Sequence, residues 1–321
     1  MIDGDEDVAA EMLAAVWPEA RAELLMLSEN ATFRVVGGPR PAVLRVHRAG
    51  YQSRDTVGSE LDWLAALASV SGLSVVEPLV VDGIRILSTV DGAGRERLGV
   101  LFAELDGEPV DVTGFAGGHF GELGRIAAQL HEHVAGWRRP PGFARFSWGL
   151  EETLGVSARW GDWRRGPGMT PGLRQTVERA GELVARRLSD FGTGPDRYGL
   201  IHADLRASNL MPGAHGFTVI DFDDCGFGWY LYDFAASVSF VETDPELGDW
   251  AQAWLDGYRS VLALSSAQAE LLPTLVMLRR LQLTAWLGGH DHAAEAADAG
   301  FASGTAELAS RYVALDAGRL W

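Results

Sequence analysis

The sequence predicts an α+β protein with two lobes, a β-rich N-terminal lobe over residues 1–104 and a mainly helical C-terminal lobe over residues 105–321. The first observation is that β-like runs, separated by turn-forming residues, fill much of the N-terminal third. The second is that helical periodicity dominates after residue 120 and continues to the C-terminus. Binding sites commonly lie in the cleft between two lobes, so we expect the functional site there.

The N-terminal lobe is predicted from apolar spacing and turn residues. Apolar residues recur at helical spacing over 55–69, whereas Gly37–Pro41 and Asp82-Gly83 mark turns between β-like runs. Asp82-Gly83 is a strong hairpin signal for the runs on either side. The predicted elements are a helix at 7–16, strands at 32–36 and 42–47, a helix at 55–69, a hairpin of strands at 74–81 and 84–90, and a strand at 99–105.

The C-terminal lobe is predicted to be helical except for a few short strands near its middle. Those strands flank the segments 202–209 and 221–224. The predicted elements are helices at 120–134 and 170–188, strands at 198–201, 210–211 and 217–220, and a helical remainder that begins at Asp233.

Composition excludes several classes of protein. The net charge of −17 argues against sequence-independent nucleic-acid binding, which needs a basic surface. Cys225 is the only cysteine, so no intramolecular disulfide forms. The first 17 residues are acidic and lack basic residues, unlike a signal or transit peptide, and no apolar stretch is long enough to span a membrane. We therefore expect a cytoplasmic protein without nucleic-acid or membrane partners, and leave its oligomeric state open.

The chain contains no lysine, because all 27 basic residues are arginine. A phosphate-binding GK[ST] loop and a Schiff-base lysine are therefore impossible. If the protein handles a nucleotide, arginine must supply the positive charge.

The most informative motif is H-x-D-x-x-x-x-N, formed by His202, Asp204 and Asn209, with Asp221 at the end of a later strand. Phosphoryl transfer needs a carboxylate to orient the attacking hydroxyl, oxygen ligands for Mg²⁺ and positive charge on the phosphates. Asp204 fits the base, Asn209 and Asp221 fit the metal ligands, and Arg206 lies close enough in sequence to act on the transferred phosphoryl group. We expect His202 to support the loop structurally.

These motifs resemble the phosphotransferase family of aminoglycoside phosphotransferases, choline kinases, type II homoserine kinases and bacterial stress-response kinases. The resemblance covers nearly the whole chain in order and implies a two-lobed protein-kinase-like fold, an ATP and Mg²⁺ requirement, with GTP left open, and transfer of the γ-phosphoryl group to a hydroxyl. It places Asn30 in a nucleotide-positioning loop and Arg45 and Glu60 as a phosphate-binding pair. It also places adenine against backbone groups near Phe102 and Glu104, and makes Asp233 a brace for the catalytic loop.

The sequence departs from the family pattern in three places. Ala203 stands where glycine is common, Asp221-Phe222-Asp223 lacks the glycine of protein kinases, and Arg45 replaces the usual lysine. Arginine keeps the charge but is bulkier and binds with a planar fork. Three alternatives remain open at this stage: Arg45 as a solvated strand residue, Asn30 as an ordinary turn residue, and Asp233 as a solvated acid at a helix start.

The resemblance implies that the acceptor site lies in the helical lobe, around the base and the segments that follow the metal-binding Asp221. Acidic and aromatic side chains there suit an ammonium-bearing acceptor, such as an amino alcohol, an amino sugar or an aminoglycoside-like molecule. The alternative is that the aromatic residues only pack in the core. The candidate substrate residues are Asp223, Asp224, Trp229, Tyr232 and Trp286.

The leading hypothesis is thus a kinase of a small hydroxylated molecule. A second is a protein serine/threonine kinase of the stress-response type, disfavoured because the span from Asp224 to Tyr232 is too short to cradle a peptide. A third is a nucleotide-binding pseudokinase, whose only support is the arginine at position 45.

Overall fold

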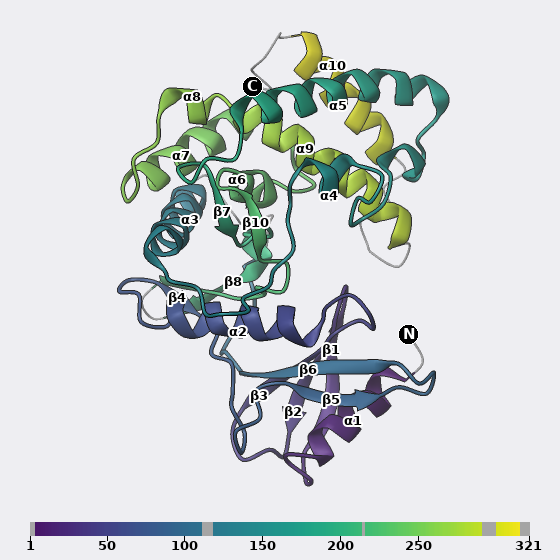
Figure 1. Cartoon of the computed structure of the whole chain (residues 1–321), viewed down its shortest axis with the longest axis vertical. Helices are drawn as coiled ribbons and strands as arrows, with labels where there is room; N and C mark the ends of the chain where they lie inside the picture. The colour runs from purple at the N-terminus through teal and green to yellow at the C-terminus, as the bar shows by residue number, and fades with distance from the viewer. Residues whose placement is uncertain (1–3, 111–117, 214–215, 291–299, 315–321) are drawn as a thin grey trace. The chain divides into compact units, whose positions relative to one another are not determined.

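The computed structural model describes residues 4–110, 118–213, 216–290 and 300–314, and divides into two compact units (Figure 1). Three segments form unit 1 and three form unit 2. Unit 1 comprises Met1–Pro109, Arg138–Arg145 and Leu210–Asp223, and unit 2 comprises Val110–Trp137, Phe146–Asn209 and Asp224–Trp321.

A five-stranded antiparallel sheet forms the main layer of unit 1 among the described residues. Apolar residues of the sheet, such as Phe33 and Leu44, pack with Met12 and Leu13 of helix α1 to form a core that excludes water. The strand order is β1 (Arg21–Leu27), β2 (Ala31–Val36), β3 (Ala42–Val46), β6 (Glu96–Ala103) and β5 (Leu87–Val90), with α1 at Asp5–Ala14.

Helix α2 (Arg54–Leu67) provides the second helix of unit 1. It begins at a capping box in which the Ser53 hydroxyl accepts the backbone N–H of Thr56, and the Thr56 hydroxyl accepts that of Ser53. Side chains alternate across a strand, so Leu44 of β3 enters the core and Arg45 faces the other way, toward Glu60 of α2.

The predicted hairpin at residues 74–90 is wrong, although its turn is correct. Asp82 and Gly83 both have positive φ, as a tight hairpin turn requires, but the flanking strands contribute only an isolated bridge between Val81 and Ile84. The flanks pair elsewhere: β4 (Ser74–Val75) is parallel to β9 (Gly216–Val219), which is antiparallel to β8 (Leu210–Gly213), and β5 joins β6.

Strand β1 was not predicted from the sequence, because its apolar and polar residues do not alternate. Leu24, Leu25 and Met26 are consecutive and all exposed, so neither face is marked as the core side. The strand forms the edge of the sheet and pairs with β2 alone.

Unit 2 is helical around a two-stranded ribbon of β7 (Tyr198–Ile201) and β10 (Gly226–Trp229), as Figure 1 shows. The predicted α+β class, with a helical C-terminal part, is confirmed, although β10 was not predicted. The longer helices are α3 (Gly118–Gly136), α5 (Pro171–Phe191), α7 (Leu247–Arg259), α9 (Leu272–Trp286) and α10 (Phe301–Ala314). The short elements are α4 (Leu150–Leu154), η2 (Trp163–Arg165), η3 (Ala207–Asn209), α6 (Tyr232–Ser237), α8 (Ser266–Ala269) and η4 (Leu287–Gly289).

Helices α3 and α7 approach so closely that only glycine fits at their crossing. A Cβ atom on Gly124 would lie 2.0 Å from the Trp254 carbonyl oxygen, and one on Gly257 would lie 1.8 Å from the Gly121 carbonyl oxygen. In the described part of the chain, no helix is long and apolar enough to cross a membrane.

Candidate active site

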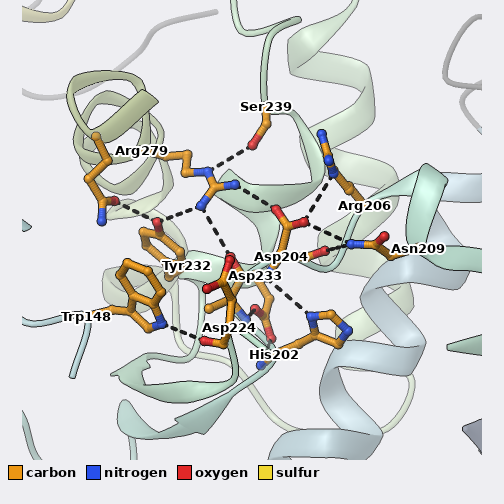
Figure 2. Close-up of polar contacts among 12 residues, drawn as sticks. Trp148, His202, Asp204, Arg206, Asn209, Asp224, Tyr232, Asp233, Ser239 and Arg279 are labelled. Carbon is orange, nitrogen blue, oxygen red and sulfur yellow. Dashed lines mark hydrogen bonds and ion pairs between the residues drawn. The ribbon is translucent and has the colours of Figure 1, made fainter. Parts of the chain in front are cut away.

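The catalytic loop of unit 2 leaves β7 in a strained conformation that one buried carboxylate supports. Ala203 has a φ of 68°, a left-handed conformation unfavourable for alanine. Asp233, fully buried on α6, accepts the backbone N–H of Ala203 at 2.7 Å and that of His202 at 3.2 Å (Figure 2). The alternative of a solvated Asp233 is therefore wrong, because its carboxylate holds the loop.

Two histidines support the same loop. His131 of α3 contacts Asp233 Oδ2 through Nε2 and the Tyr258 hydroxyl through Nδ1, both at 3.0 Å. A carboxylate only accepts, so Nε2 of His131 donates to Asp233. His202 is buried, and its Nδ1 accepts the backbone N–H of Asp204 at 3.3 Å. These contacts hold the backbone on both sides of Ala203.

Asp204 is the centre of the polar cluster in Figure 2. Its Oδ1 is 2.7 Å from Arg279 Nη2, whereas Oδ2 is 3.2 Å from Arg206 Nε and 2.9 Å from Asn209 Nδ2. Burial alone would raise the pKa of Asp204, but the positive charges of Arg206 and Arg279 outweigh it and hold the pKa below its ordinary value. Asp204 is therefore an ionised carboxylate at neutral pH, as the orienting group of a hydroxyl must be.

Arg279 is the residue of this cluster that sequence reasoning missed. The signal present in the sequence was a pair of arginines inside the mostly apolar run 271–287, because arginines in a helix of that kind require buried partners.

Asn209 is oriented in a way that suits a metal ligand. Its Nδ2 donates to both the backbone oxygen and Oδ2 of Asp204, which turns its Oδ1 away from that residue. Asp221 lies in unit 1, where its φ of 62° and a side chain that is 42% exposed present the carboxylate outward. Both groups offer the hard oxygen atoms that Mg²⁺ prefers.

In unit 1, Arg45 and Glu60 form a buried bidentate ion pair, as the resemblance implied. Arg45 Nη2 lies 2.6 and 2.8 Å from the two carboxylate oxygens of Glu60, and Nη1 lies 3.4 Å from Asp221 Oδ1. Burial would lower the pKa of Arg45, but Glu60, Asp223 and Asp221 raise it, so the guanidinium stays charged. The guanidinium also lies 4.9 Å from the centroid of the Phe102 ring. The alternative of a solvated strand residue is wrong.

Asp223, a candidate substrate residue, also lies in unit 1 and is buried by polar contacts. Its Oδ2 accepts Asn30 Nδ2 at 2.5 Å, and its backbone oxygen accepts Gln52 Nε2 at 2.7 Å and a guanidinium N–H of Arg145. Asn30 thus links the β1–β2 loop to the segment that carries Asp221.

The predicted adenine-binding residues end strand β6. Phe102 is paired with Val43 of β3, and Glu104 binds Arg34 through its side chain at 2.7 Å. A cavity of about 470 Å³ begins just beyond them, lined by Leu105, Asp106, Met211, Pro212, Gly213 and Thr218. The residues that follow Glu104, rather than Phe102, therefore line a space large enough for a nucleobase.

The other candidate substrate residues divide into two groups. Tyr232 donates to Gln282 and accepts from Arg279, and Asp224 accepts the Trp148 indole N–H through its backbone oxygen, so both join the Asp204 cluster (Figure 2). Trp229 instead donates to the Gly192 carbonyl oxygen and packs on Tyr198. Trp286 packs on Phe240 and His290.

Comparison with known proteins agrees with this geometry. The model of the "Phosphotransferase enzyme family" matches residues 24–264. The solved structure of a microcompartment-associated aminopropanol kinase is 45% identical, covers 98% of this chain and 99% of that one, and superposes with a TM-score of 0.88. Amicoumacin kinase of Bacillus subtilis (strain 168) is 25% identical, covering 86% of this chain and 83% of its own.

A solved structure of the amicoumacin kinase hAmiN, in complex with AMP-PNP, Ca²⁺ and Ami, shares the fold. It is 22% identical, covers 98% of this chain and 94% of that one, and has a TM-score of 0.77. The chain belongs to the phosphotransferase enzyme family, and is a kinase that acts on a hydroxyl of a small molecule.

Proposed function

We propose that this protein transfers the γ-phosphoryl group of ATP to the hydroxyl of a small amino alcohol carrying one ammonium group. The observation that carries the proposal is the 45% identity to an aminopropanol kinase over nearly the full length of both chains. The acidic and aromatic residues around Asp204 support it independently.

The reaction follows from the chemistry of the residues. The acceptor hydroxyl oxygen attacks the γ-phosphorus, its proton passes to the Asp204 carboxylate, and the bond from phosphorus to the β–γ bridging oxygen breaks. The bridging oxygen leaves with its electron pair as part of ADP. Arg206 and Arg45 are the two arginines proposed to bind the phosphates, and the ion pair with Glu60 holds Arg45 in place.

Asn209 and Asp221 are the proposed ligands of a divalent cation. Each residue supplies a hard oxygen donor, since Asn209 Oδ1 is turned away from Asp204 and the Asp221 side chain is 42% exposed. A divalent cation held by them would neutralise phosphate charge. The ordinary ion for this donor set is Mg²⁺.

The charge around Asp204 favours an acceptor with a single positive charge. Two carboxylates, Asp204 and Asp224, interact electrostatically with Arg279, and Asp204 also interacts with Arg206. The two negative and two positive charges of these residues cancel. If Arg206 turns toward the phosphates, one negative charge remains, which one ammonium group neutralises. A polycationic aminoglycoside would carry more positive charge than this cluster balances.

Aromatic rings supply a further surface for an ammonium group. The Trp148 ring centroid lies 5.1 Å from that of Trp160 and 6.4 Å from that of Tyr232. Ring faces attract cations by about 0.5–2 kcal/mol each. The Trp148 and Tyr232 rings are fully buried, so the half-buried Trp160 ring that packs on Trp148 and the Asp224 side chain are the proposed walls of the acceptor site.

The proposal is tested by measuring ADP release with Mg-ATP and a panel of acceptors. We expect turnover with aminopropanol and related amino alcohols, with propanol and an aminoglycoside at least about ten-fold poorer in kcat/KM. EDTA should abolish turnover and added Mg²⁺ should restore it. Equal rates with propanol would contradict the amino-alcohol assignment.

The two alternative functions are tested in the same experiment. Labelled ATP added with a cell lysate would produce labelled protein bands if the acceptor were a protein. Strand β10 (Gly226–Trp229) occupies most of the span between Asp224 and Tyr232 and pairs with β7, which gives no support to a peptide-binding segment. A pseudokinase would bind nucleotide without any turnover.

A further inference from the structure

Arg279 is held by more partners than any other cation near Asp204. Its Nε donates to Ser239 Oγ at 2.9 Å, and its Nη1 donates to the Tyr232 hydroxyl at 3.1 Å and to the Ala203 carbonyl oxygen at 3.4 Å. Its Nη2 donates to Asp204 Oδ1 at 2.7 Å. The side chain is only 3% exposed, so its position is fixed by packing as well as by polar contacts.

Arg206 contacts the same carboxylate in a different way. Its Nε lies 3.2 Å from Asp204 Oδ2, and its side chain is 33% exposed. An exposed arginine near one oxygen can turn toward a phosphate, whereas a buried arginine with four acceptors cannot leave. Asp204 Oδ1 is therefore held by the fixed Arg279, whereas Oδ2 keeps its hydrogen bond from Asn209 Nδ2 and has a second partner, Arg206, that can move.

We propose that Arg279 is a positioning residue that holds Oδ1 of Asp204 and leaves Oδ2 to receive the proton of the acceptor hydroxyl. The inference rests on the proposed function, since it assigns the orientation of the group that acts as base there. Without Arg279 the carboxylate could rotate about its Cβ–Cγ bond, and the productive orientation would be lost.

The same contacts link the base to the acceptor wall. Arg279 donates to Tyr232, whose hydroxyl donates to Gln282 Oε1 at 2.6 Å, and the guanidinium lies 5.1 Å from the centroid of the Trp160 ring. Arg279 thus fixes, through one side chain, both the carboxylate and a ring proposed to face the acceptor.

The next residue supplies a matched control. Arg280 is equally buried on α9, but it donates to Glu242 Oε2 at 2.7 Å, to Thr305 Oγ1 at 2.9 Å and to the Phe301 carbonyl oxygen at 3.0 Å. These partners tie α9 to α10 and include no member of the Asp204 cluster. Replacing Arg280 tests the effect of losing a buried arginine from this helix without disturbing the base.

The test compares Arg279→Lys and Arg279→Met with Arg280→Lys and Arg280→Met in the full-length protein, using Mg-ATP and aminopropanol. We expect Arg279→Met to lower kcat by about 100-fold while KM for ATP changes less than about three-fold, because a misplaced catalytic group costs rate rather than nucleotide binding. Arg279→Lys should recover part of kcat, since lysine keeps the charge but not the four contacts. Folded Arg280 variants should keep the wild-type kcat.

The outcomes separate the inference from the proposed function. A wild-type protein without turnover would overturn both. An active wild type with Arg279 variants that keep kcat within two-fold, or with Arg280 variants that lose as much, would overturn only the role of Arg279. If Arg279→Met does not fold, Ser239→Ala, which removes a single anchor of the guanidinium, should lower kcat with no change in KM for ATP, and an unchanged kcat would count against the inference.

Discussion

The Arg45 cluster of unit 1 and the Asp204 cluster of unit 2 use the same components with opposite roles. In unit 1 a fully buried carboxylate, Glu60, holds an arginine, and Arg45 is the group proposed to act on phosphate. In unit 2 a fully buried arginine, Arg279, holds a carboxylate, and Asp204 is the group proposed to act on the hydroxyl. In each cluster the more deeply buried partner positions the one that reacts.

The comparison explains how a chain without lysine keeps both functions. Arg45 Nη2 contacts both carboxylate oxygens of Glu60 while Nη1 lies 3.4 Å from Asp221 Oδ1, so two nitrogens of one rigid plane are held at once. Arg45 is therefore oriented by Glu60 more strictly than a lysine ammonium would be.

The largest expected effect comes from removing the supporting carboxylate in unit 1. Glu60→Gln leaves Arg45 charged and buried beside a neutral amide, which should lower the free energy of unfolding by about 3–5 kcal/mol. Denaturant unfolding measures this loss. Asp62 lies on the same helix as Glu60 and forms a more exposed ion pair with Arg85. Asp62→Asn should therefore lower the free energy of unfolding by at most about 1 kcal/mol. An equal loss in both variants would contradict the buried role of Glu60.

A smaller effect is expected at the α3–α7 crossing, which positions His131 behind the catalytic loop. Gly124→Ala places a methyl group against the Trp254 carbonyl oxygen, and the resulting helix shift should cost about 1–3 kcal/mol of stability. Gly136→Ala on the same helix meets no neighbouring atom within 4 Å and should be neutral or stabilising. Thermal unfolding of the two variants provides the comparison, and similar melting temperatures would argue against the close approach.

The Arg45→Lys variant keeps the positive charge at this position and removes the planar guanidinium, so it tests whether the shape of arginine matters in unit 1. We expect kcat/KM for ATP to fall about ten-fold, because a lysine ammonium that takes the place of Nη2 beside Glu60 leaves no second nitrogen to reach the phosphates. Steady-state kinetics with varied ATP measure the change. A gain in kcat/KM would show that lysine fits this site better than arginine does.

The smallest effect is expected for Ala203→Gly. Glycine removes the left-handed strain at this position but adds freedom to the unfolded chain, so the net change in stability should be within about 1 kcal/mol, in the stabilising direction. Asp233 can still accept the backbone hydrogen bonds from residues 202 and 203, so kcat should stay near the wild-type value. A large loss of either quantity would show that the alanine methyl group has a packing role.

Sequence reasoning predicted the fold class and the residues that meet at each cluster better than it predicted local pairing. Asp204, Asn209 and Asp233 come together because their spacing follows short strands and a helix start, and such local signals survive folding. The pairing of Ser74–Val75 with β9 depends on residues more than 140 positions away, which no local turn signal reveals. For Arg279, the apolar run around it indicated a buried arginine, but its partner Asp204 lies 75 positions away and could not be read from that run.

The Asp204→Asn variant tests most directly the claim that Asp204 is the reacting partner and the arginines its support. The amide retains the shape of the side chain but cannot take the hydroxyl proton. With Mg-ATP and aminopropanol, kcat should fall by about 10³-fold, while the dissociation constant of Mg-ATP, measured by calorimetry, changes less than about three-fold. A fall in kcat of less than ten-fold, or a loss of nucleotide binding that accounts for the whole decrease, would contradict the assignment.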